Sequence, residues 1–286
     1  MKNLFGNVRT LLSNAHVRSA YAKWLLAKTF TGQPPRFEVG NGALVGGWIN
    51  FSEYVSYSTS SGIAENEKKF ARECLARAGQ SPVAFDLGAN IGVFTCFLAS
   101  LGQVRVHSFE PITETFCRLK TNVFDNRLAG KCSLNCLAVG GGYDLVTFSL
   151  FGNAPGLNRL STESDPGGTS DSGCFQRVVT VALDDYCDKL GIDRIHFLKV
   201  DVEGMKPAVL AGANRLMSKK AIDAILMEVC PKNLRTVGFD PAILYKRIRD
   251  VGYRPFSLTS DGNIGKEMRF EILQETDSPN VVVVPE

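Results

Sequence analysis

A single stretch, from Val83 to Leu101, constrains the fold of this chain more than any other. It begins with an apolar run up to Leu87 that is long enough for a buried strand, passes through a turn bounded by Gly88 and Gly92, and continues with apolar residues at helical spacing. A strand, a glycine turn and a helix in this order open a βαβ unit, and ligands of open parallel sheets lie beyond the carboxyl ends of such strands. We therefore expect a binding crevice beside these glycines.

The spacing of the glycines indicates which ligand the crevice takes. A dinucleotide-binding turn has the pattern G-x-G-x-x-G, whereas this turn has Asp86 before Gly88 and lacks the third glycine. A carboxylate at that position repels phosphate and attracts a cation. Glu110, at the end of the next predicted strand, is placed to accept both hydroxyls of a ribose. The two acids together favour S-adenosylmethionine, whose sulfonium and amino groups are positive, over the alternative of an ordinary turn with a solvated aspartate.

Composition limits the other classes of function. The chain has 286 residues, of which 44% are hydrophobic, which suits one large domain with an extension. Its formal charge of +3 is too balanced to indicate a nucleic-acid partner. The 8 cysteines contain no C-x-x-C pair, so we expect free thiols in a reducing, cytoplasmic compartment. The 3 histidines have no ligand spacing to one another, and we do not expect a zinc site.

The first 60 residues are predicted to be an N-terminal extension of a domain at 61–286. Residues 1–37 contain no Asp or Glu but six basic residues, and their apolar residues, Tyr21 and Leu25 among them, fall roughly on one face of a helix. Three interpretations remain open: a helix packed on the domain, a basic amphipathic helix on a membrane or a partner, or an organelle-targeting segment. No apolar run reaches the ~18 residues that span a bilayer. Residues 38–60 predict short strands or a hairpin that caps the substrate side.

The rest of the chain alternates between helical and strand patterns. Helix starts are predicted at Ser60–Gly62, at Thr113 and at Asp240. Strands are predicted at 83–87, 104–110, 133–139, 145–150, 178–183, 195–202, 221–229, 253–258 and 281–284. Residues 151–176 lack periodicity and predict a lid, a binding loop or disorder. The alternation predicts an α/β fold built on a doubly wound, mostly parallel sheet.

Several motifs of the chain resemble those of the FkbM-type methyltransferases, which are class I enzymes that use S-adenosylmethionine. The matching pieces cover roughly residues 60–286 and are Phe85–Gly92, Phe109–Pro111, Leu183–Asp185, Leu198–Gly204, Val209–Gly212 and the strand that ends at Glu228. The first two occur in many class I methyltransferases, whereas Lys199–Gly204 is more specific to the family. The resemblance implies a seven-stranded sheet whose last strand is antiparallel, and O-methylation of a hydroxyl on a sugar or a natural product.

The resemblance also implies which residues bind the cofactor. The residues expected to line the methionine end of S-adenosylmethionine are Asp86, Gly88, Ala89, Asn90 and Gly92. Glu110, with Pro111 beside it, is expected to hold the ribose hydroxyls. Ala138 and Val139, at the end of the third strand, are expected to lie near the adenine.

Methyl transfer to an alcohol depends on positioning and on removal of the hydroxyl proton. Holding the reactants at near-attack distance is worth up to ~7–11 kcal/mol, and a placed base typically adds ~10²–10⁴-fold. Asp201 and Glu203 are the candidate bases at the end of the strand at 195–202, and Lys199 on the same face would orient a carboxylate or lower its pKa. The alternative is that these three residues form a structural ion network. A divalent metal at Asp201 and Glu203 stays an open alternative, because too few oxygen ligands are evident to predict one.

Two other functions stay open at the level of the sequence. A nicotinamide-dependent oxidoreductase would share the fold, but the missing third glycine and Asp86 count against it. A non-catalytic methyltransferase-like domain, held at a membrane or in a complex by residues 1–37, would bind anionic vesicles without turnover. No single residue identifies the methyl acceptor, which we expect to be a hydroxyl of a small molecule or a glycan. The loop at 151–176 and residues 38–60 are expected to decide it.

Overall fold

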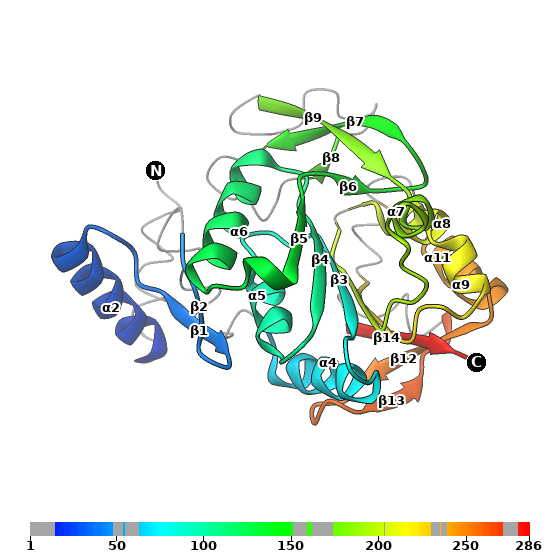
Figure 1. Ribbon diagram of the computed structural model, residues 1–286, viewed down its shortest axis with the longest axis horizontal. Coiled ribbons are helices and arrows are strands. Elements are labelled where there is room, and N and C mark those ends of the chain that lie inside the picture. The colour runs from blue at the N-terminus through cyan, green and yellow to red at the C-terminus, as the bar shows by residue number, and fades with distance from the viewer. Residues whose placement is uncertain are drawn as a thin grey trace.

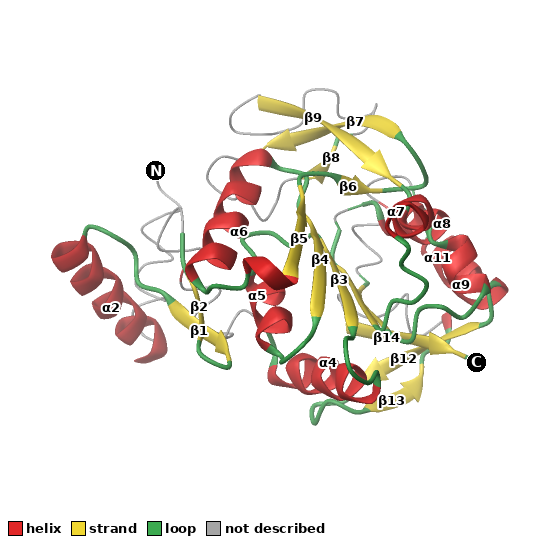
Figure 2. Cartoon of the chain, in the orientation of Figure 1, coloured by secondary structure: helices red, strands yellow, loops and turns green. Residues whose placement is uncertain are grey.

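The fold is seen in a computed structural model that describes residues 15–47, 54, 63–150, 159–161, 174–202, 204–229, 235, 239–270 and 280–286. Its centre is an eight-stranded sheet with helices on both faces (Figure 1; Figure 2). In sheet order the strands are β13 (Ile264–Glu267), β12 (Tyr253–Leu258), β14 (Asn280–Pro285), β11 (Ile225–Glu228), β10 (Phe197–Val200), β3 (Val83–Leu87), β4 (Arg105–Phe109) and β5 (Cys132–Asn135). The strands from β11 to β5 are parallel to one another.

The predicted architecture is confirmed, with one strand added. The strands from β5 to β12 form the doubly wound sheet, and β14 runs antiparallel between β11 and β12, as the resemblance implied. The added strand, β13, follows the turn at Asp261–Gly262 and pairs antiparallel with β12 at the edge of the sheet. Two strands are shorter than predicted. The strand predicted at 195–202 is limited to β10, and the strand predicted at 221–229 is limited to β11.

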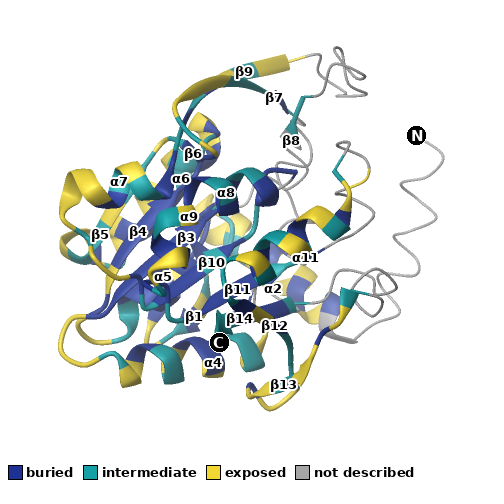
Figure 3. Cartoon of the chain, turned by 90° about the vertical axis from the view of Figure 1, so that its right-hand side faces the viewer, coloured by how far each residue is buried: buried dark blue, intermediate teal, exposed yellow. Residues whose placement is uncertain are grey.

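Alternate residues along each central strand pack against two different layers of helices. The first layer consists of α4 (Glu65–Arg77), α5 (Val93–Ser100) and α6 (Thr113–Asp125). The second layer consists of α7 (Leu183–Leu190), α8 (Lys206–Gly212), α9 (Asn214–Ser218) and α11 (Pro241–Asp250). On β3, Ala84 packs in the first layer and Phe85 in the second, so Asp86 faces the first layer again. Figure 3 shows the buried residues concentrated along the central strands, between the helices.

The predicted helix starts agree with the structure in part. Asp240 caps α11, because its side chain accepts a hydrogen bond from the backbone N–H of Ala242 at 2.9 Å. α6 begins at Thr113 itself and has no side-chain cap, so Thr113 is not the cap that the sequence predicted. α4 begins at Glu65, and the start predicted at Ser60–Gly62 lies outside the described residues.

A second sheet, which the sequence did not predict, covers the carboxyl ends of the central strands. In sheet order it consists of β6 (Ala138–Val139), β9 (Cys174–Val181), β7 (Asp144–Leu150) and β8 (Arg159–Leu160). The strand predicted at 133–139 is divided, because its first part is β5 of the central sheet and its last two residues pair with the end of β9. The inner face of the second sheet buries Phe148 and Val178. The described parts of the loop predicted at 151–176 lie in β8, at Ser161 just after it and in β9.

The N-terminal extension begins with α2 (Ala15–Thr31), which lies at the outer edge of the molecule (Figure 1). This helix buries Val17 and Trp24, and the Trp24 ring lies 5.3 Å from the ring of Tyr54. The helix is therefore packed on the domain, as one of the three interpretations predicted. The predicted buried face was partly wrong, because Tyr21 and Leu25 are 41% and 46% exposed.

A hairpin of β1 (Phe37–Gly40) and β2 (Ala43–Val45) follows α2. Asn122 of α6 fastens this hairpin to the glycine turn, since its Nδ2 donates to the carbonyl oxygens of Gly46 at 3.0 Å and of Ile91 at 2.8 Å. The hairpin packs on α5 and contributes no residue to the cavity described below. Its described part therefore does not cap the substrate side, contrary to the prediction; residues 48–60, apart from Tyr54, lie outside the described residues.

Three further observations hold for the described residues alone. The seven cysteines among them form no disulfide. No group of three or more His, Cys, Asp or Glu side chains in this part of the chain is arranged to hold a metal ion. No helix in the same ranges is long and apolar enough to cross a bilayer.

Candidate active site

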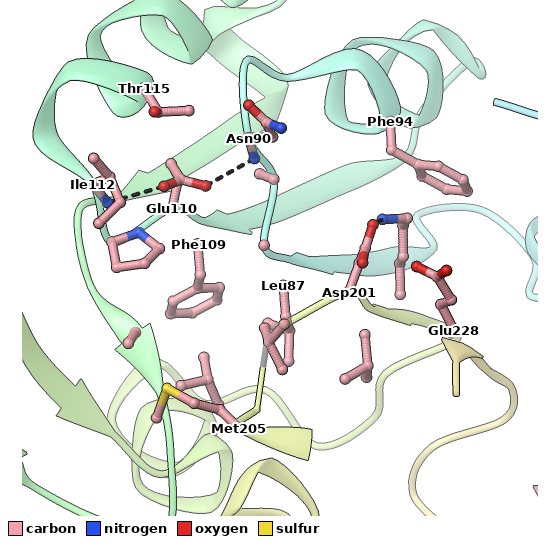
Figure 4. Close-up of a pocket in the computed structure, with 18 of the residues that line it drawn as sticks. Leu87, Asn90, Phe94, Phe109, Glu110, Ile112, Thr115, Asp201, Met205 and Glu228 are labelled. Carbon is pink, nitrogen blue, oxygen red and sulfur yellow. Dashed lines mark hydrogen bonds and ion pairs between the residues drawn. The ribbon is translucent and has the colours of Figure 1, made fainter. Parts of the chain in front are cut away.

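The candidate active site is a cavity at the carboxyl ends of the central strands, beneath the second sheet (Figure 4). Its volume is about 480 Å³, within the ~300–1,000 Å³ typical of small-molecule sites. The predicted cofactor residues that line it are Gly88, Ala89, Asn90, Glu110, Pro111, Ala138 and Val139. Asp86 and Gly92 do not line it, whereas Lys199 and Asp201 do.

The turn after β3 brings the backbone to the wall of this cavity. Gly88 has a φ of +77° and Gly92 a φ of +91°, in the left-handed region that favours glycine. A Cβ on Gly88 would collide with the carbonyl oxygen of Asp201, so the end of β10 lies directly against this turn. The backbone N–H groups of Gly88 and Ala89 donate to the carbonyl oxygen of Phe109 at 3.0 and 2.9 Å. These contacts hold the ends of three adjacent strands together around the cavity.

Glu110, which follows β4, faces the glycine turn across the cavity wall. Its Oε2 accepts from the backbone N–H of Asn90 at 2.9 Å, and its Oε1 accepts from that of Ile112 at 2.9 Å (Figure 4). Burial raises the pKa of Glu110 to about 7, although the two backbone donors act in the opposite direction. A carboxylate has about four acceptor positions, so two remain for a ligand.

The far end of the cavity is apolar and is roofed by the second sheet. Ala138 and Phe148 from this sheet meet Ile112 and Met205 there. One side chain, Gln176 of β9, fastens the roof to the segment after β4. Its Nε2 donates to the carbonyl oxygen of Pro111 at 2.7 Å, and its Oε1 accepts from the backbone N–H of Thr113 at 3.1 Å. This end therefore has the apolar walls that suit an aromatic ring.

Asp86 lies beneath the cavity and not on its wall, which differs from the predicted contact with the cofactor. It is fully buried, because the alternation along β3 directs its side chain under α5. Its Oδ2 accepts a hydrogen bond from Thr95 at 2.7 Å, and its Oδ1 has no hydrogen-bond partner among the described residues. Burial raises the pKa of Asp86, while Lys199, directly opposite on β10, and Thr95 act to lower it.

Lys199 and Asp201 form an ion pair at the polar end of the cavity. Lys199 Nζ lies 2.7 Å from Asp201 Oδ2 and 5.3 Å from the ring centre of Phe94. Burial acts to lower the pKa of Lys199, but the carboxylates of Asp201, Asp86 and Glu67 outweigh it and raise the pKa. Burial likewise acts to raise the pKa of Asp201, but Lys199 outweighs it and lowers the pKa. Both groups are therefore charged at neutral pH, and Asp201 is a weak base. Glu203, the other predicted base, lies outside the described residues.

Glu67, in the first turn of α4, is a further carboxylate of this end that the sequence did not reveal. It lines the cavity with Glu228 and Asn280, and Asn280 Nδ2 donates to its Oε1. Burial raises the pKa of Glu67, and Lys199 offsets part of that rise. In the sequence Glu67 stands in the charged run Glu65–Lys69, where a solvated helix surface is the ordinary expectation. Only the docking of α4 over the end of β10 brings it to the cavity.

Comparison with known proteins gives a family and several relatives. A family model described as the Methyltransferase FkbM domain matches residues 86–255. The 31-O-demethyl-FK506 methyltransferase FkbM of Streptomyces tacrolimicus is 32% identical in an alignment of 170 residues that covers 50% of this chain and 65% of that protein. The hexuronic acid methyltransferase AglP of Haloferax volcanii is 24% identical over 185 residues, which are 64% of this chain and 68% of that protein. The chain thus spans about two thirds of the length of these relatives.

The chain is also similar to a solved structure. It is the O-methyltransferase of Bacillus cereus in complex with SAH, with a TM-score of 0.44 and 11% sequence identity. The match covers 93% of this chain and 97% of that chain.

Proposed function

The chain belongs to the FkbM methyltransferase family, and from this premise we propose that it transfers a methyl group from S-adenosylmethionine to a hydroxyl of a sugar or another small-molecule natural product. The observation that carries the proposal is the cavity, which joins an apolar end, a ribose-type carboxylate at Glu110 and a second, acidic end. One ligand with an aromatic base, a ribose and a positively charged tail matches all three parts.

The donor set of the cavity fits S-adenosylmethionine. The two acceptor positions left on Glu110 suit a pair of ribose hydroxyls. Gly88 lets the turn that lines the cavity lie directly against the end of β10, where a side chain would collide with the carbonyl oxygen of Asp201. Asp201 and Glu228 line the acidic end beside Lys199, and their carboxylates suit a cationic group. When bound, S-adenosylmethionine would supply a methyl group attached to positively charged sulfur. The alcohol oxygen would bond to the methyl carbon as the carbon–sulfur bond breaks, and the hydroxyl would lose its proton.

Within this function, Glu67 is the group that takes the hydroxyl proton. A base must have a free carboxylate whose pKa is matched to its task. Asp201 is held by Lys199, and its lowered pKa weakens it. Glu67 lines the same end, and burial raises its pKa toward the working range. The Lys199–Asp201 pair then has a different task, to orient the acceptor and to keep a fixed positive charge beside Glu67.

Binding and turnover by the full chain test the function. We expect heat on titration of S-adenosylmethionine and none on titration of NADH. With a labelled methyl donor and a panel of sugars and polyhydroxylated natural products, label should appear in the acceptor and resist alkali, because an ether is stable where a methyl ester is hydrolysed. Alkali-labile label would show carboxyl methylation and contradict the hydroxyl assignment. Binding of the donor without turnover on any acceptor would favour the non-catalytic alternative.

The affinity for S-adenosylmethionine should rise with pH through about 7, where Glu110 ionises. The ribose hydroxyls donate to the ionised carboxylate, so binding releases a proton wherever Glu110 is protonated in the free protein. Glu110→Gln should weaken binding by roughly 10–150-fold, equivalent to the ~1.5–3 kcal/mol of hydrogen bonds to a charged group, and should flatten the pH dependence. Calorimetry at pH values on both sides of 7 measures both effects. Glu114→Gln, an exposed neighbour on α6, is the matched control.

The same carboxyl should affect the stability of the unliganded protein. Its pKa of about 7 in the folded state exceeds the ordinary value of 4.5, so the protonated form favours folding. This contribution is fully present below pH 4.5 and is lost as the pH rises through 7. Unfolding by denaturant across this range should therefore show a fall in the free energy of unfolding that Glu110→Gln reduces. An equal fall in both proteins would contradict the assignment.

A further inference from the structure

Helix α2 has two apolar faces, of which the domain covers only one. Val17, Ala20 and Trp24 are each 6% exposed and form the covered face. On the helix, which turns by about 100° per residue, Leu26 lies roughly opposite Trp24. Leu26 is 57% exposed and Phe30, one turn later, is 81% exposed. With Leu25 they form an outward strip, which we call the α2 strip (Leu25, Leu26 and Phe30).

Helix α2 carries basic residues and no acids. Lys23 is exposed and, by the same helical geometry, lies beside Phe30, and the exposed Arg18 lies about two turns before Leu25 on nearly the same side of the helix. Lys28 lies over the Trp24 ring, with its Nζ 5.4 Å from the ring centre. Residues 1–37 as a whole contain no Asp or Glu. Exposed apolar side chains next to Lys and Arg on a helix without acids suit the interface of an anionic bilayer, where the basic side chains contact the headgroups.

We propose that α2 lies on the surface of an anionic lipid bilayer, with the α2 strip inserted at the boundary between headgroups and acyl chains. Charge complementarity selects this occupant. A second copy of the chain would place one acid-free basic helix against another and would be repelled, whereas anionic headgroups attract Arg18 and Lys23. The contact between Trp24 and Tyr54 holds the helix to the domain, so binding of the helix to the bilayer places the whole protein at the membrane surface.

Vesicle co-sedimentation of the full chain tests this proposal. We expect binding to vesicles of phosphatidylcholine that also contain phosphatidylserine, weaker binding at high salt because the attraction is screened, and little binding to phosphatidylcholine alone. Leu26→Glu with Phe30→Glu should abolish sedimentation. Arg18→Gln with Lys23→Gln should weaken it by roughly 30-fold, since each basic residue near the surface contributes about 1 kcal/mol.

Matched variants keep the test falsifiable. Tyr143→Ser with Leu145→Glu instead removes exposed apolar side chains at the start of β7, where the two residues are 84% and 57% exposed, and this variant should bind like the wild type. Unchanged far-ultraviolet circular dichroism verifies that each variant is folded. The proposal is overturned if the wild type does not bind anionic vesicles or if Leu26→Glu with Phe30→Glu still sediments with them. It is also overturned if sedimentation velocity shows a dimer of the wild type that this pair of substitutions dissociates.

Discussion

Replacing Glu67 by glutamine should lower kcat by about 10²–10⁴-fold, the range ordinarily contributed by a placed general base. The amide keeps the shape of the side chain and can still contact Asn280, but it cannot take a proton. The affinity for S-adenosylmethionine should change little, because Glu110 and the glycine turn lie elsewhere in the cavity. Rates at saturating donor and acceptor, together with calorimetric titration of the donor, measure both quantities.

Glu65→Gln is the matched control for this substitution. Glu65 lies two residues away in the same helical turn, its side chain is 75% exposed, and it pairs with Lys68 at 2.7 Å instead of facing the cavity. Its kcat should stay near that of the wild type. If Glu67→Gln instead weakens donor binding and leaves kcat unchanged, Glu67 holds the cofactor. If Glu228→Gln or Asp201→Asn removes activity while Glu67→Gln does not, the base is one of those residues.

The pH profile separates a base from a structural residue. The pKa of Glu67 is raised by burial, and the charged groups that face it are Lys199, Asp201 and Glu228. The wild-type kcat should fall as the pH drops through that raised pKa, because the protonated carboxyl cannot accept a proton. Glu67→Gln should lose this acidic limb, whereas a variant that merely disturbs packing would keep it at a lower rate.

Gly88→Ala should abolish cofactor binding and destabilise the fold. A left-handed φ of +77° costs a non-glycine residue about 1–2 kcal/mol. The added Cβ would also collide with the backbone carbonyl of Asp201, which no rotamer change can relieve; overpacking of this kind typically adds about 1–3 kcal/mol. Either the glycine turn or the end of β10 must move, and each forms a wall of the cavity. Denaturant unfolding and titration of S-adenosylmethionine check the two effects.

Gly42→Ala isolates the backbone cost from the collision. Gly42 has a φ of +78°, and a Cβ there would have no neighbour within 4 Å. It lies in the hairpin between β1 and β2, away from the cavity. This variant should lose about 1–2 kcal/mol of stability and bind the cofactor normally. Equal behaviour of the two variants would show that the contact between Gly88 and β10 has no role in the site.

The parts of the site that follow from local patterns were predictable from the sequence. The glycine turn and Glu110 follow strands whose apolar runs are plain, and the ends of parallel neighbours meet at one edge of a sheet. Their placement on one cavity therefore required only the correct strand order. Asp86 shows the limit of this reasoning, because its position in the motif suggested contact with a ligand, while the period of two along β3 directs the side chain under α5.

Glu67 and the second sheet could not be predicted in this way, since neither depends on local pattern. Glu67 reaches the cavity only because a helix that precedes the motif docks across the end of β10. The second sheet depends on the pairing of Ala138 and Val139 with β9, about 40 residues later in the chain. A two-residue strand carries no periodic signal, so the sequence predicted a single strand at 133–139 in place of β5 and β6.

The position of β14 has a consequence for synthesis of the protein. This strand hydrogen-bonds to β11 on one side and to β12 on the other, and Asn280 at its start contacts Glu67. On the ribosome, β11 and β12 emerge before residues 280–286. Until β14 has been synthesised, each of these two strands has an edge without its hydrogen-bonding partner. Such edges invite association with other chains. We therefore expect nascent chains to depend on chaperones at this stage, and Glu67 to gain its contact with Asn280 only after β14 has paired.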